Sequence, residues 1–333
     1  MANRRQLLQG LGAAGMVGWL GLLPERLDAE PPPETKRIRV LNRPSICDAP
    51  QFVAEELLQA EGFTDIRYVK LKDLAAMEAA VSTAEVDITM NWIVPMIARI
   101  DAGEPIVTLA GVHVGCVDVF ANERMRTIRE LKGKKIAAVA PRDGFHLFFG
   151  SIAAYVGLDP AKDIDWIHQP TAEWPISLEK GKLDAFAGFP PITQELRARK
   201  IGHVVLNTLT DRPWSQYFCC VIVGNKEFVK RNPVATKRAV RAILKATDLC
   251  SLQPELVARI LVDKGYVDRS DYAGQAMKEV AYGKWREYDP ADTVRFYALR
   301  LQEVGLIKSS PQKILTQGTD WRFLKELRTE LKG

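Results

Sequence analysis

Cysteine and histidine are the most reactive side chains in this chain, because they can act as nucleophiles, proton acceptors or metal ligands. Cys47 and His146 are a candidate nucleophile and base, provided that the fold brings them together. No histidine stands in a recognised catalytic motif. The cysteines fit no zinc-ligand spacing, and an odd number cannot all form disulfides: Cys47, Cys116, Cys219, Cys220 and Cys250. Cys116, Cys219 and Cys220 lie in apolar runs typical of small buried residues. We predict neither a metal nor a cofactor.

Two loops that follow predicted strands carry side chains suited to holding a small molecule. Cys47 and Asp48 lie between the first strand and a helix. Asp48 is predicted to contact the ligand, or alternatively to cap that helix. Asn91 and Trp92 follow the strand predicted over residues 86–90. An asparagine both donates and accepts hydrogen bonds, and a tryptophan offers a stacking face, so we expect both to contact the ligand.

A helix predicted over residues 143–156 begins with a third candidate loop. Backbone N–H groups at a helix start suit anions, so Gly144, Phe145 and His146 are predicted ligand contacts. Asp143 is the expected cap of this helix and would occupy the same donors. A simple oxyanion is therefore a poor fit. A single histidine such as His146 can equally be structural.

Further aromatic residues fall in or beside predicted cleft loops: Trp174, Phe189, Trp214 and Tyr217. Any one of them could belong to the core instead. Together with Trp92 they indicate an aromatic-lined cleft, which suits a ring or a cation. Asp48 and Asp143 add negative charge. The prediction is a neutral, zwitterionic or amine-bearing organic ligand rather than an inorganic anion.

The elements that must position these residues alternate between strand and helix. Strands are predicted at residues 38–41, 86–90 and 135–140, for example, with helices between them and a mostly helical chain after residue 226. The alternation predicts βαβ crossovers and mainly parallel sheets, an α/β fold with a helical C-terminal tail. The length of 333 residues suggests two domains. Ligands of such folds bind at the carboxyl ends of the strands, where the loops converge.

The N-terminus reads as an export signal over residues 1–30. Arg4 and Arg5 precede an apolar run rich in glycine, alanine and leucine, and the pair resembles a twin-arginine signal. Asn3 and Gln9 depart from the usual pattern. A membrane anchor or an ordinary helix is the alternative, although the apolar run is short for a span. Residues 31–35 are predicted to be a proline-rich linker.

Composition excludes several classes of protein. Apolar residues make up 47% and charged residues 26%, which is a globular balance. The net charge of +5 is small, and the basic run at residues 132–135 has no interleaved aromatics, so nucleic-acid binding is not expected. No fixed-period repeat is visible. We expect a monomer that binds a small molecule.

A set of motifs resembles one known family in order and spacing, over residues 38–260. The motifs are Ala-Glu-Val-Asp-Ile (84–88), Ala-Gly-Glu-Pro-Ile-Val (102–107), Ile-Arg-Glu-Leu-Lys-Gly-Lys-Lys-Ile-Ala (128–137), Gly-Leu-Asp-Pro-Ala-Lys-Asp-Ile (157–164) and Leu-Glu-Lys-Gly-Lys-Leu-Asp-Ala-Phe (178–186). They resemble the solute-binding proteins of ABC importers for nitrate, sulfonates, taurine and thiamine-pyrimidine precursors. These proteins have the type II periplasmic binding fold.

The resemblance implies two lobes, a location and partners. Lobe 1 is expected to comprise residues 36–121 and 216–333, and lobe 2 residues 122–215. Two crossover segments form a hinge, and the ligand binds in the cleft and favours closure. The protein is expected in the periplasm, where it delivers a sulfonate- or taurine-like, amine-bearing or heteroaromatic solute to an ABC permease and ATPase.

Two other functions remain open at this stage. Enzymes of pyrimidine and menaquinone pathways share the architecture, and Cys47 with His146 could serve such a reaction. A periplasmic sensor that presents its ligand to a receptor is the second alternative. Export argues against a cytosolic biosynthetic step, and we expect a binding protein rather than an enzyme.

Overall fold

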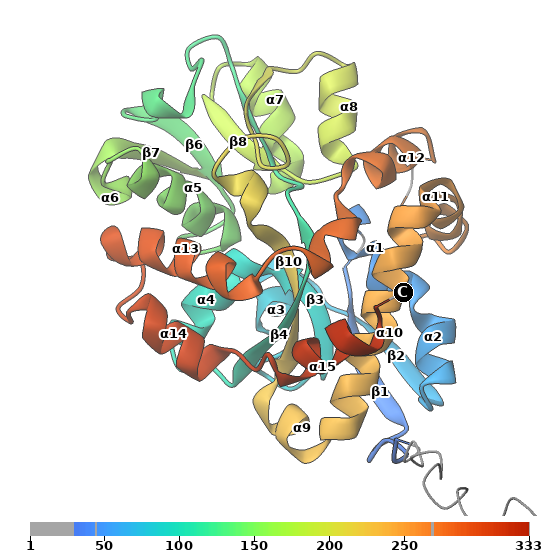
Figure 1. Cartoon of the computed structure of the whole chain (residues 1–333). Helices are drawn as coiled ribbons and strands as arrows, with labels where there is room; N and C mark the ends of the chain where they lie inside the picture. The colour runs from blue at the N-terminus through green and yellow to red at the C-terminus, as the bar shows by residue number, and fades with distance from the viewer. Residues whose placement is uncertain (1–29, 44, 268–269, 333) are drawn as a thin grey trace, which may run out of the picture. The chain divides into compact units, whose positions relative to one another are not determined.

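Two small sheets are built from strands of the first third of the chain and one strand that arrives much later (Figure 1). β1 (Arg37–Asn42) pairs in parallel with β2 (Asp65–Lys70). β10 (Phe218–Asn225) lies between β3 (Ile88–Trp92) and β4 (Ile106–Val114) and runs antiparallel to both. All residues of these last three strands are buried, so they form the centre of the core.

A five-stranded sheet is built from one uninterrupted stretch, with the order β7-β6-β8-β5-β9. Its strands are β5 (Asp118–Ala121), β6 (Lys134–Ala138), β7 (Ile164–His168), β8 (Ala185–Gly188) and β9 (His203–Asn207). β6 is parallel to β7 and β8, whereas β5 is antiparallel to β8 and β9.

Helices connect the strands and form most of the chain after β10. Before β10 they are α1 (Ala49–Val53), α2 (Glu55–Ala60), α3 (Leu74–Ala79), α4 (Ile93–Asp101), α5 (Gly144–Tyr155), α6 (Pro160–Asp163), α7 (Trp174–Glu179) and α8 (Ile192–Ala198). After β10 they are α9 (Lys226–Arg231), α10 (Pro233–Leu252), α11 (Pro254–Asp263), α12 (Ser270–Glu279), α13 (Pro290–Glu303), α14 (Pro311–Gly318) and α15 (Arg322–Glu330).

Side-chain caps fix where the helices near the loops begin. Asp73 accepts a hydrogen bond from the Ala76 N–H at the start of α3. Asp143 accepts one from the His146 N–H at 2.7 Å at the start of α5, as predicted. Each cap satisfies a backbone donor that has no partner within its helix. The loops before α3 and α5 are thereby held at defined positions.

The computed structural model describes residues 30–43, 45–267 and 270–332. The described residues from 33 onward form one compact unit. The predicted export signal falls almost entirely outside the described residues. Among the helices that are described, none has both the length and the apolar character needed to cross a bilayer.

The predicted α/β fold with a helical C-terminal region is confirmed. The sequence patterns missed β2, whose residues Asp65, Arg67 and Lys70 interrupt its apolar positions, because this strand lies half-exposed at a sheet edge. Within the mostly helical C-terminal region they also assigned no helix at α14, which begins at Pro311. The predicted lobe boundaries at residues 121 and 215 remain a prediction.

Candidate functional site

A cavity of about 580 Å³ opens among the loops that follow β1, β3, β6, β7 and β8. It is of the size that encloses a small organic molecule. Its walls are mostly apolar, with a few convergent polar groups. The lining residues are Arg43, Ser45, Cys47, Lys72, Asp73, Leu74, Met77, Glu78, Asn91, Trp92, Pro95, Val139, Phe145, Pro170, Thr171, Phe189 and Cys220.

Three aromatic rings form one wall of the cavity. Trp92, at the junction of β3 and α4, meets Phe189 edge-on with ring centroids 4.9 Å apart. Phe145, in the first turn of α5, lies 5.7 Å from Trp92 and 5.8 Å from Phe189. These tilted and edge-on arrangements are favourable for aromatic pairs. The wall offers ring faces and edges to a flat ligand.

Glu78 of α3 occupies the first backbone donor of α5. Its Oε1 accepts a hydrogen bond from the Gly144 N–H at 3.1 Å. A Cβ on Gly144 would lie 2.9 Å from the Trp92 ring and 3.0 Å from Glu78 Oε1, so this close approach requires glycine. Burial raises the pKa of Glu78 to about 7. The carboxyl group can therefore be neutral or ionised near neutral pH.

The positive charge of Arg43 is balanced within the protein. Its guanidinium donates to both carboxylate oxygens of the buried Asp48, at 2.8 and 2.9 Å, and to Asn91 Oδ1 at 3.1 Å. The alternative interpretation of Asp48 as a helix cap is wrong, because its side chain makes no capping hydrogen bond to α1 and binds Arg43 instead. Asn91 Nδ2 is buried and has no hydrogen-bond partner among the described residues. It is a donor available to a ligand.

Several residues predicted from the sequence meet at this cavity. Its lining includes Cys47, Asn91, Trp92, Phe145 and Phe189. Asp48 and Gly144 lie directly behind the lining, through their hydrogen bonds to Arg43 and Glu78.

Four other predicted residues lie elsewhere. His146 stacks on Trp166 at 4.0 Å, and burial lowers its pKa to about 4. Trp174 packs behind Phe145 with centroids 4.8 Å apart. Trp214 packs on Tyr155, and Tyr217 stacks on Phe296. None of these four lines the cavity, so the structure does not place Cys47 and His146 in one pocket.

Sequence reasoning did not single out Arg43, Glu78 or Cys220 as lining residues. Arg43 lies in the loop after β1. Because loops after strands were already expected to form the site, its position in the sequence could have identified it. Glu78 lies on the short helix α3 beside Leu74 and Met77, which also line the cavity. A carboxylate on such a helix normally faces solvent, and no local pattern distinguishes this one.

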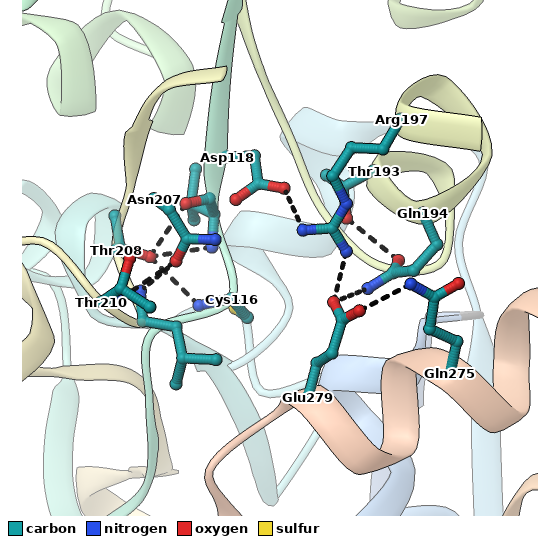
Figure 2. A network of polar contacts seen from close by, with 12 residues as sticks. Cys116, Asp118, Thr193, Gln194, Arg197, Asn207, Thr208, Thr210, Gln275 and Glu279 are labelled. Carbon is teal, nitrogen blue, oxygen red and sulfur yellow. Dashed lines mark hydrogen bonds and ion pairs between the residues drawn. The ribbon is translucent and has the colours of Figure 1, made fainter. Parts of the chain in front are cut away.

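A polar network outside the cavity lining joins α8 to α12 (Figure 2). Arg197 contacts Asp118 on β5 and Glu279 on α12, and Gln194 also donates to Glu279 at 2.8 Å. Burial raises the pKa of Asp118 to about 6. Burial opposes ionisation of Glu279 as well, but hydrogen bonds from Arg197, Gln194 and Gln275 leave its pKa below the ordinary value.

Comparison with known proteins gives one family and one fold. The profile of the NMT1-like family matches residues 31–261. The periplasmic nitrate-binding protein NrtA from Synechocystis PCC 6803 superposes with a TM-score of 0.73 at 15% identity, over 91% of this chain and 90% of that chain. A putative sulfonate-binding protein SsuA from Methylobacillus flagellatus KT gives 0.65 at 18% identity, over 89% and 94%.

One curated relative matches at the level of sequence. It is the nitrate import ATP-binding protein NrtC from a Synechocystis strain, 23% identical over 221 residues, or 62% of this chain. The chain spans about a third (32%) of the length of that relative. The structural likenesses confirm the predicted periplasmic binding protein fold.

Proposed function

Because the chain belongs to the NMT1-like family, we propose that it is the solute-binding component of an ABC importer and captures a small organic solute in the cavity. The observation that carries this proposal is the cavity itself. It combines a wall of three aromatic rings with one buried carboxyl group, on Glu78. The aromatic wall takes residues from both predicted lobes, Trp92 from lobe 1 and Phe145 and Phe189 from lobe 2.

The buried and half-buried charged groups around the cavity, Arg43, Asp48 and Glu78, favour an amine-bearing heteroaromatic solute over an anion. An anion at the start of α5 would need the Gly144 N–H that Glu78 already occupies. Arg43 is already paired with Asp48. A ring amine can instead donate to Glu78, and a ring nitrogen or carbonyl can accept from Asn91 Nδ2. The ring itself would stack among Trp92, Phe145 and Phe189.

An enzymatic function has less support. The pair proposed for it, Cys47 and His146, does not share the cavity, since His146 stacks on Trp166. Acid–base or nucleophilic catalysis requires two such groups within hydrogen-bonding reach of the reacting atoms. Binding a solute without converting it accounts for the same cavity and requires no such pair of catalytic groups.

A thermal-shift screen tests the solute class. The panel contains nitrate, taurine, alkyl and aryl sulfonates, phosphonates, amines, aminopyrimidines and flavins. A ligand at a hundred times its dissociation constant stabilises the protein by about 2.7 kcal/mol. We expect an aminated heteroaromatic compound to raise the melting temperature most. A larger rise with nitrate or a sulfonate would contradict the proposed charge preference.

Two variants sharpen the screen. Glu78→Gln removes the negative charge, so it should weaken binding of cationic amines and improve that of sulfonates. Glu85→Gln, an exposed carboxylate near the same helix, is the matched control and should change neither. Recovery of a chemically converted ligand, detected by mass spectrometry, would replace the binding function with an enzymatic one.

Delivery to a permease and ATPase in the periplasm is the remaining part of the proposal. Deletion of the gene should abolish uptake of the isotope-labelled solute by cells. Undiminished uptake, with loss of a transcriptional response to the solute, would instead indicate a sensor. Export of a fusion that carries residues 1–30, compared with an Arg4→Lys/Arg5→Lys variant, tests the predicted twin-arginine route.

A further inference from the structure

Four thiols and one imidazole meet directly behind the solute cavity. The donor atoms of Cys47, His113 and Cys116 lie within 4.8 Å of one another, and so do those of Cys116, Cys219 and Cys220. We call these five residues the thiol cluster. None of the five is more than 8% exposed. Residues far apart in sequence thus converge on one buried point, which the cysteine spacing along the chain could not reveal.

Irregular backbone brings the cysteines of the cluster to the same side. Neighbouring residues on a regular strand point to opposite faces. The pairing of β10 with β4 shifts register on both sides of Cys220, and such a bulge redirects side chains. Cys219 and Cys220 can therefore both approach Cys116.

The backbone at Cys116 is held in place by the neighbouring segment that contains Thr208 and Leu209. Gly115 has a φ of +57° and lies so close to Leu209 that a Cβ would be 2.4 Å from its Cα. Thr208 Oγ1 accepts hydrogen bonds from the N–H groups of Cys116 and Val117, at 3.1 and 2.9 Å (Figure 2). Rigid backbone of this kind is what a preorganised ligand site requires.

Thiolate sulfur and imidazole nitrogen together are a donor set for thiophilic metal ions. Zinc sites use four cysteines, or three with one histidine, and soft thiolates also select Cu(I). Both ring nitrogens of His113 lie near carbonyl oxygens, at 3.3 Å from Gly115 O and 3.2 Å from Cys47 O. One nitrogen could bind an ion while the other donates to its carbonyl, as metal-bound histidines commonly do.

We propose that the thiol cluster binds one thiophilic d¹⁰ metal ion through the sulfur atoms of Cys116, Cys219 and Cys220. Either Cys47 or His113 supplies the fourth ligand. The site joins the segment between β4 and β5 to β10, where the chain passes from the three-stranded sheet to the five-stranded sheet and later returns. Cys47 and Cys220 also line the solute cavity. A bound ion therefore fixes the positions of two residues that line the cavity. This inference does not depend on the identity of the solute.

Co(II) is the probe that tests the site, because thiolate-bound Co(II) absorbs visibly and Zn(II) displaces it. The full chain is purified under anaerobic, reducing conditions, freed of metal with a chelator and titrated with Co(II). We expect sulfur-to-cobalt charge-transfer and tetrahedral d–d bands that saturate at one equivalent. Zn(II) should then remove both bands.

Variants assign the ligands. Cys219→Ser should weaken Co(II) binding by more than the roughly 10–100-fold typical of outer-shell changes. Cys47→Ser is a second variant, placed at the cavity wall, in case the first does not fold. Cys250→Ser is the matched control, because Cys250 is buried in α10 and belongs to neither group of donors. Circular dichroism and thermal melting establish that each variant is folded.

Three outcomes would overturn the proposal. One is the absence of charge-transfer bands in reduced protein whose thiols are chemically free. Another is unchanged bands in folded Cys219→Ser and Cys116→Ser variants. The third is a Cys116–Cys219 disulfide in protein recovered from the periplasm, with no Co(II) binding after reduction. The two sulfur atoms are 2.7 Å apart, so this pair would then be a redox pair rather than a metal site.

Discussion

Trp92 and Arg197 each form a contact between the two predicted lobes. Trp92 does so by aromatic packing, and Arg197 does so by ion pairs. Trp92 is buried and packs against Phe145 and Phe148 of α5 and against Phe189. Arg197 joins Asp118 and Glu279 in a network whose side chains are only partly shielded. The aromatic contact is strong and insensitive to salt, whereas the ionic contact is weak and screened. Salt should therefore weaken the contact made by Arg197 and leave the contact made by Trp92 in place.

The largest expected effect comes from removing the ring at the centre of the aromatic wall. Trp92→Ala should lower the free energy of unfolding by about 3–5 kcal/mol, because a buried aromatic side chain is lost and a cavity remains. Urea denaturation followed by circular dichroism measures the change. Trp166→Ala, a half-buried tryptophan stacked on His146, is the control and should cost less. A loss below about 1 kcal/mol for Trp92→Ala would mean that the wall collapses around the gap.

Glu78 should make the stability of the protein depend on pH in a defined window. Its pKa is 4.5 in an ordinary environment and about 7 in the fold, so the folded protein holds this proton more tightly. The resulting stabilisation is fully present below pH 4.5 and is lost as the pH rises through about 7. The difference corresponds to about 3 kcal/mol.

Glu78→Gln should remove that part of the pH dependence. Asp143, Arg99 and Arg43 also face Glu78 and influence its charge, and Asp118 titrates in the same region of pH. The comparison is therefore the difference between wild type and variant, measured by chemical denaturation across the window. Parallel curves for the two proteins would refute a raised pKa at this position. Glu85→Gln should give curves parallel to wild type.

The polar network should show a smaller effect that depends on salt. Arg197→Ala should reduce the free energy of unfolding by about 1–2 kcal/mol, between the values for exposed and buried ion pairs. High ionic strength should shrink this difference, whereas the Trp92→Ala effect should persist. A double-mutant cycle with Glu279→Ala isolates the pair. A salt-independent loss would indicate that Arg197 acts through packing instead.

The smallest effect is expected at Tyr217, which lies outside both regions, unlike Phe189 of the aromatic wall. Phe189→Ala should weaken binding of the solute found in the screen about tenfold, or about 1.4 kcal/mol, since Phe189 lines the cavity. Tyr217→Ala should change that affinity less than twofold, because Tyr217 stacks on Phe296 away from the cavity. Isothermal titration calorimetry distinguishes the two. Equal losses would place the solute elsewhere.

The fold and the family could be predicted because their signals are local and repeated. Alternating strands and helices indicated the α/β class, and five ordered motifs indicated the family, which the matching profile over residues 31–261 confirms. The ends of the predicted strands located Asn91, Trp92 and Phe189 near the cavity, because both β3 and β8 end beside it.

The rest of the site depends on information that no short segment contains. Trp214 and Tyr217 were expected in the cleft, but each found an aromatic partner elsewhere, on Tyr155 and Phe296. Glu78 looked like a solvent-exposed position of a helix. The thiol cluster assembles only when the loop after β1 meets the start of β10, so its spacing along the chain has no motif to recognise.

The order of strands also determines the order in which the protein can fold during synthesis. The five-stranded sheet is complete once residues 118–207 have left the ribosome. β3 and β4, although made earlier, pair only through β10 and must wait for residues 218–225. Until then two strands that are wholly buried in the folded protein lack their partner strand on the nascent chain, a condition that favours aggregation. The three-stranded sheet at the centre of the core is therefore completed after the five-stranded sheet, although two of its strands are made first.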